Sequence, residues 1–85
     1  MAKVEIYLTP TCPFCTRAKA LLVKKGVPFE EINVAGDPDL RAAMTDRANG
    51  RYTVPQIFID DKHIGGNDNI QALEMRGELD ALLGL

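Results

Sequence analysis

The sequence lacks the features of a membrane, secreted or nucleic-acid-binding protein. It contains no apolar run of about 18 residues, the length that a membrane-spanning helix needs. Its 10 basic residues are scattered among 12 acidic ones and leave a net charge of -2, so no surface for phosphate groups is indicated. Lys3 and Glu5 place charges where a secretory leader would be apolar. We therefore expect a cytoplasmic protein that binds neither nucleic acid nor a membrane.

Cysteine and histidine are also scarce, which narrows the chemistry that the cysteines can perform. Cys12 and Cys15 are the only cysteines, and a disulfide between them would close too small a loop to stabilise the fold much. Together with His63, the single histidine, they offer fewer metal ligands than a closed zinc site needs. We favour a redox-active pair in a reducing compartment, with half of a zinc site as the alternative.

No internal repeat, low-complexity stretch or linker divides the chain. Its 85 residues, of which 46% are hydrophobic, suit a single domain spanning residues 1–85 with a modest core. We expect this domain to be a monomer.

In the first half of the chain, strand patterns alternate with helix patterns. Val4, Ile6 and Leu8 recur at every second position, which indicates a strand with one buried face. Pro13 suits the first position of a helix, and Gly26 suits its end. The expected elements are a strand at residues 3–8, a helix at residues 13–25, a strand at residues 29–34 and a helix that follows Asp37 and ends before residues 49–50.

The second half of the chain predicts a hairpin followed by a helix. β-Branched and aromatic residues indicate a strand at residues 53–60, and a tight turn leads from it to a short strand at residues 63–64. Asn67 or Asp68 is expected to cap the next helix, and a last helical piece lies near the C-terminus. This βαβαββα order predicts an α/β fold with a four-stranded mixed sheet, a right-handed crossover and helices on both faces.

The two cysteines lie where a strand gives way to a helix. Cys12 falls at the helix N-terminus, where unpaired N–H groups and the helix dipole favour a thiolate. Cys15 follows about one turn later, in surroundings that we expect to be more buried. We infer that Cys12 attacks a disulfide and that Cys15 resolves the mixed disulfide that forms.

Three motifs at these separations resemble those of the glutaredoxin family, dithiol class, and the resemblance covers essentially the whole chain. The motifs are Cys12-Pro13-Phe14-Cys15, Thr53-Val54-Pro55 and Gly65-Gly66-Asn67-Asp68. The resemblance implies a thioredoxin-like fold and a glutathione-dependent enzyme that reduces protein disulfides and glutathione mixed disulfides. It also implies that glutathione is the reductant and co-substrate, with no tightly bound cofactor and no metal.

The same resemblance implies a glutathione site made of Thr53, Val54, Pro55, Asn67 and Asp68. A cis-proline at position 55 would leave the backbone of Val54 free to pair with the cysteinyl unit of glutathione. Backbone N–H groups near Asn67 would receive the γ-glutamyl carboxylate, and Asp68 its ammonium group. The alternatives are an ordinary strand-initial proline and residues that only cap a helix.

Four further positions qualify this interpretation. Thr9 stands where the family often has a lysine, and Asn69 stands where many relatives have an aspartate, so we predict weaker glutathione binding. Gln56 either contacts the glycyl carboxylate of glutathione or faces water by strand alternation. His63 is expected to face solvent and has no catalytic role.

An alternative function is that of an iron–sulfur cluster carrier. In that hypothesis, Cys12 of two subunits and two glutathione molecules hold a [2Fe–2S] cluster, as the resemblance allows. Pro13 disfavours it, because relatives with a small residue at that position hold clusters more readily.

Overall fold

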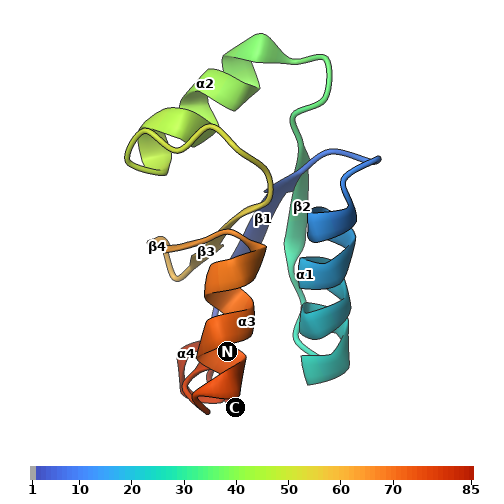
Figure 1. Ribbon diagram of the computed structural model, residues 1–85. Coiled ribbons are helices and arrows are strands. Elements are labelled where there is room, and N and C mark those ends of the chain that lie inside the picture. The colour runs from blue at the N-terminus through green and yellow to red at the C-terminus, as the bar shows by residue number, and fades with distance from the viewer. Residues whose placement is uncertain (1) are drawn as a thin grey trace.

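The computed structural model describes residues 2–85 and arranges strands and helices in alternation along most of the chain (Figure 1). The elements are β1 (Val4–Leu8), α1 (Pro13–Lys25), β2 (Glu30–Asn33), α2 (Pro38–Arg47), β3 (Gln56–Ile59), β4 (Lys62–Gly65), α3 (Asn67–Met75) and α4 (Leu79–Leu83). Within this part of the chain, no helix is both long and apolar enough to cross a membrane.

The four strands form one mixed sheet in the order β2-β1-β3-β4. β1 is parallel to β2 and antiparallel to β3, and β4 is antiparallel to β3. One apolar cluster joins β1 and β3 to α1, α3 and α4, whereas a second cluster joins the same strands to α2. Helices therefore cover both faces of the sheet, and the predicted α/β fold is confirmed (Figure 1).

Strand β1 is buried along its whole length, so the expectation of one buried face is wrong. Val4, Ile6 and Leu8 belong to the cluster beneath α1 and α3, as their alternation predicts. Tyr7 belongs to the α2 cluster, and Glu5 on the same side is only 7% exposed. The reason is that β1 is an interior strand with helices on both faces, which makes alternation a poor guide to burial.

Helix α3 begins one or two residues earlier than expected, because Gly66 is its N-cap and neither Asn67 nor Asp68 caps it. Gly66 has no side chain that could cap the helix. Instead, Oδ1 of Asn69 accepts the Gly66 N–H at 2.9 Å from within the first turn. A long-range bond adds to this local one, since Nη1 of Arg51 donates to the same oxygen at 3.0 Å.

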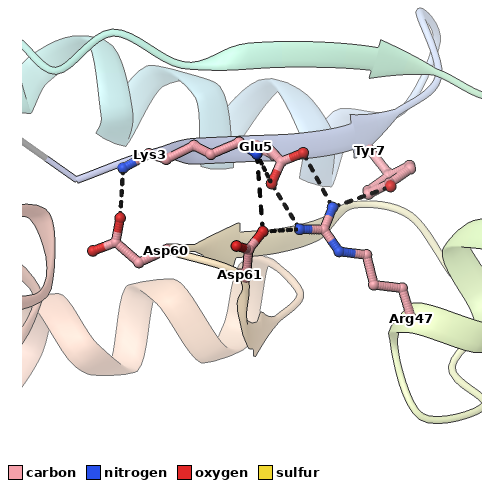
Figure 2. A network of polar contacts seen from close by, with 6 residues as sticks. All are labelled: Lys3, Glu5, Tyr7, Arg47, Asp60 and Asp61. Atoms are coloured by element: carbon pink, nitrogen blue, oxygen red, sulfur yellow. Dashed lines mark hydrogen bonds and ion pairs between the residues drawn. The ribbon is translucent and has the colours of Figure 1, made fainter.

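A charged network makes the burial of Glu5 compatible with the fold (Figure 2). The guanidinium of Arg47 donates to both carboxylate oxygens of Glu5, at 2.7 and 3.1 Å, and to the hydroxyl of Tyr7 at 3.2 Å. It also donates to Asp61 at 3.0 Å and lies 4.0 Å from the ring centre of Phe58. The network therefore ties α2 to the sheet through β1 and the β3–β4 turn.

We predict that the Glu5→Gln variant is destabilised by about 2 kcal/mol at neutral pH, because one buried charge-assisted pair is lost. The hydrogen bonds from Arg47 lower the pKa of Glu5 below its ordinary value of 4.5. Its contribution to stability is therefore present above that value and is lost as the pH falls through the lower pKa of the folded state. Urea unfolding of both proteins between about pH 7 and pH 2 measures the difference.

The matched control is Glu31→Gln, which removes the same charge from an exposed pair with Lys19. This exposed pair is expected to contribute less than about 1 kcal/mol. Equal losses for the two variants, or a Glu5→Gln deficit that persists in acid, would contradict the network's assigned role.

Candidate active site

Cys12 is the N-cap of α1, and its sulfur takes the place of the usual capping oxygen. The backbone N–H of Cys15 donates to Sγ of Cys12 at 3.2 Å, and Pro13 occupies the first helical turn. The thiol in turn lies 3.7 Å from the carbonyl oxygen of Val54, to which it donates. Cys12 is partly exposed, so its sulfur is accessible to a substrate while being held by the helix N-terminus.

Cys15 lies one turn into the same helix and is buried, with 2% of its surface exposed. Burial and, to a smaller extent, the hydrogen bond with Cys12 together raise the pKa of its thiol to about 12. Both cysteines are free thiols in this structure. The pair is therefore asymmetric: one sulfur is accessible, and the other is a buried thiol that keeps its proton at neutral pH.

A cleft of about 260 Å³ opens beside the cysteine pair. It is lined by Phe14, Arg51, Thr53, Val54, Pro55, Gly66, Asn67 and Asp68. The structure thus brings together all five residues that the sequence assigns to the glutathione site. The Val54–Pro55 peptide bond is cis, as the resemblance implies.

One wall of the cleft is the loop that carries Thr53, Val54 and Pro55, and the other is the start of α3. Arg51 connects these two walls, and it was not identified from the sequence. It lies in the loop before Thr53 and donates to Asn69 near the start of α3. A side chain at Gly65, where φ is +117°, would collide with the amide of Asn69. The prediction of weaker glutathione binding considered only that Asn69 lacks the charge of an aspartate. In the structure, the amide oxygen of Asn69 accepts hydrogen bonds from Gly66 and Arg51.

The structure overturns the water-facing alternative for Gln56 and the expectation that His63 faces solvent. Gln56 is fully buried and does not face water: its amide N–H donates to the carbonyl of Thr53 at 3.0 Å. His63 is only partly exposed, since its Nε2 lies 2.7 Å from the amide oxygen of Gln56 and its ring lies over Phe58. Burial, with a smaller effect from the charge of Arg51, lowers the pKa of His63. Both side chains therefore support the loop that carries Thr53.

The chain is similar in sequence and in structure to known glutaredoxins. A family model described as Glutaredoxin matches residues 4–64. A probable glutaredoxin of Synechocystis is 60% identical over 82 residues, covering 96% of this chain and 93% of the relative. Glutaredoxin 3 of Escherichia coli is 58% identical over 83 residues, covering 98% and 99%. A crystal structure of a buckwheat glutaredoxin–glutathione complex superposes with a TM-score of 0.88 at 29% identity, covering 98% of this chain and 77% of that one.

We predict that Asn69→Ala exposes the Gly66 amide to exchange and lowers the free energy of unfolding by about 1 kcal/mol, because that N–H and Arg51 both lose their acceptor. Asn69→Asp keeps an oxygen at the same place and is expected to retain the protection. Native-state hydrogen exchange of the Gly66 amide measures the effect directly. Unchanged protection in Asn69→Ala would show that this side chain does not hold the Gly66 amide.

Proposed function

The chain belongs to the glutaredoxin family and is a glutathione-dependent oxidoreductase; from this premise we propose that it reduces protein disulfides and glutathione mixed disulfides through Cys12. The observation that carries the proposal is the asymmetric cysteine pair beside a cleft: an accessible Cys12 sulfur that accepts the Cys15 N–H at 3.2 Å. A sulfur in that position is a nucleophile whose negative charge is stabilised by the start of α1.

With a glutathione mixed disulfide, the Cys12 thiolate attacks the glutathione sulfur. A bond forms between the two sulfurs, the old disulfide breaks, and the protein client leaves as a thiolate that takes up a proton. A second glutathione thiolate then attacks the sulfur of the bound glutathione. It forms glutathione disulfide and returns Cys12 to its thiolate, so one free glutathione is consumed for each client thiol that is released.

We propose that the cleft is the binding site for glutathione. The backbone of Val54, whose carbonyl lies 3.7 Å from Sγ of Cys12, is placed to pair with the cysteinyl unit like an added strand. Asn67 and Asp68 begin α3 at the other end of the cleft, where free N–H groups suit a carboxylate and Asp68 suits an ammonium. The buckwheat glutaredoxin forms a complex with glutathione, which supports glutathione as the ligand of the cleft.

With a protein disulfide, Cys15 is proposed to complete the reaction. After Cys12 forms a mixed disulfide with the client, Cys15 loses its proton and attacks the Cys12 sulfur. The client then leaves as a dithiol, and a Cys12–Cys15 disulfide remains for two glutathione molecules to reduce. Because burial raises the pKa of Cys15, this step requires a thiolate that is scarce at neutral pH.

We predict that Cys15→Ser still removes glutathione from a mixed disulfide but loses the reduction of a protein disulfide by on the order of 100-fold or more, because the internal thiol is replaced by a dilute external one. Coupled assays on a glutathionylated peptide and on a disulfide-bonded protein measure the two activities separately. In the native protein, the Cys15-dependent activity is expected to rise with pH across the neutral range, since more of that thiol ionises.

The control for this experiment is Cys12→Ser, which should abolish both activities. If Cys15→Ser lost both activities as well, or if Cys12→Ser kept either, the assigned roles would be wrong.

We also predict that Thr9→Lys lowers the KM for glutathione about threefold to tenfold, because it restores the charge that the family often carries at this position. Thr9 is half-buried in the turn before Cys12 and is close enough to Cys15 to line a cavity with it. Steady-state kinetics with varied glutathione measure the change. Thr11→Lys adds the same charge at an exposed position of the turn and serves as the control. An unchanged KM in Thr9→Lys would contradict the prediction that Thr9 weakens glutathione binding.

The cluster-carrier hypothesis stays a prediction. It uses the same Cys12 and the same glutathione, so anaerobically purified protein with glutathione decides it: a [2Fe–2S] cluster absorbs visible light, whereas a dithiol does not.

A further inference from the structure

A second groove, between α1 and α3, runs on from the glutathione cleft. It has a volume of about 410 Å³ and is lined by Arg17, Ala20, Leu21 and Lys24 of α1 and by Asn67 and Gln71 of α3. Asn67 lines both the groove and the cleft, so the two hollows adjoin. The groove therefore adjoins the cleft at the start of α3.

The charges in this groove are not neutralised by the protein. Within residues 2–85, Arg17 and Lys24 form no ion pair, and no acidic side chain lines the groove. Other basic side chains near by are engaged: Lys19 pairs with Glu31, and Lys25 pairs with Glu74 and Asp80. The groove thus holds two cations without an ion-pair partner in the part of the chain that the structure describes, although the net charge of the chain is -2.

Arg17 is also held toward the active site. Its guanidinium lies 5.5 Å from the ring centre of Phe14, which lines the glutathione cleft. On the opposite wall, the amide N–H of Gln71 donates to Asn67 at 3.2 Å, so this wall offers neutral polar groups and no negative charge. The groove is therefore positive near the cysteines and along its length.

We propose that this groove binds an acidic, extended segment of a protein disulfide substrate, adjoining the cysteine that reacts with Cys12. Arg17 and Lys24 are seven positions apart on α1, which is a rise of about 10 Å along a helix. An extended chain of the polyproline II type covers about 9 Å in three residues and presents every third side chain on the same face. Carboxylates at positions i and i+3 of the substrate segment match the two cations. The inference rests on the proposed reduction of protein disulfides and adds the chemistry of the client.

The test uses synthetic peptides with one internal disulfide and a tail, placed before or after it, that carries two Asp, two Asn or two Lys residues three positions apart. We expect kcat/KM for the Asp tail to exceed that for the Asn tail about threefold to tenfold and the Lys tail to be the poorest substrate. The preference is expected to shrink in about 0.5 M salt, which screens exposed charges.

Lys24→Gln and Arg17→Gln should each weaken the preference for the Asp tail. Lys62→Gln removes an exposed lysine of β4, outside the groove, and should leave the preference intact. Reduction of the small mixed disulfide of cysteine and glutathione should be unchanged in Lys24→Gln, because that substrate does not reach the groove. An equal loss in Lys62→Gln, or no preference among the three tails, overturns the proposal.

A binding measurement separates this inference from the proposed function. If no peptide disulfide is reduced, the proposed function fails, and the groove is then tested by NMR titration with a peptide whose cysteines are replaced by serine. Amide shifts confined to residues 17–24, Asn67 and Gln71 with the Asp tail alone support the groove. Shifts elsewhere, or the same shifts with every tail, overturn it.

Discussion

The hydrogen bond from the Cys15 N–H to Sγ of Cys12 is the interaction on which the active site depends. A helix leaves its first N–H groups without partners, and α1 satisfies one of them with a sulfur in place of an oxygen. The same local rule that starts the helix thereby holds the sulfur of Cys12, which we propose as the nucleophile, at the start of α1. It also places Cys15 inside the first turn, where the core buries it and raises its pKa to about 12.

The rest of the fold forms the two walls of the cleft beside the sulfur of Cys12. One wall is the loop that carries Thr53. The buried amide of Gln56 donates to the carbonyl of Thr53, and His63 contacts the amide oxygen of Gln56. The other is the start of α3, where Asn69 supports Gly66 and Arg51 connects the two walls. Each wall is thus a short backbone segment fixed by side chains behind it. Such segments suit recognition of a peptide-like substrate through main-chain groups.

Sequence patterns predicted those features of the fold that depend on neighbouring residues, such as the ends of helices. Pro13 and Gly26 mark the ends of α1 as expected, because their backbone preferences act within a turn. Alternation placed β1, but it did not reveal that Glu5 is buried, since that depends on Arg47, which is far away in sequence. Arg51 was missed for the same reason: its partner Asn69 is distant along the chain, and no sequence pattern marks the contact.

We propose a functional asymmetry in which the fold makes Cys12 reactive and keeps Cys15 protonated and inaccessible. Its most direct test is alkylation of the reduced native protein with a limiting amount of iodoacetamide at neutral pH, with the modified site located by mass spectrometry. The account predicts that the label is found on Cys12 and that Cys15 becomes reactive only after unfolding. Labelling of both thiols at similar rates in the folded protein, or of Cys15 first, would contradict it.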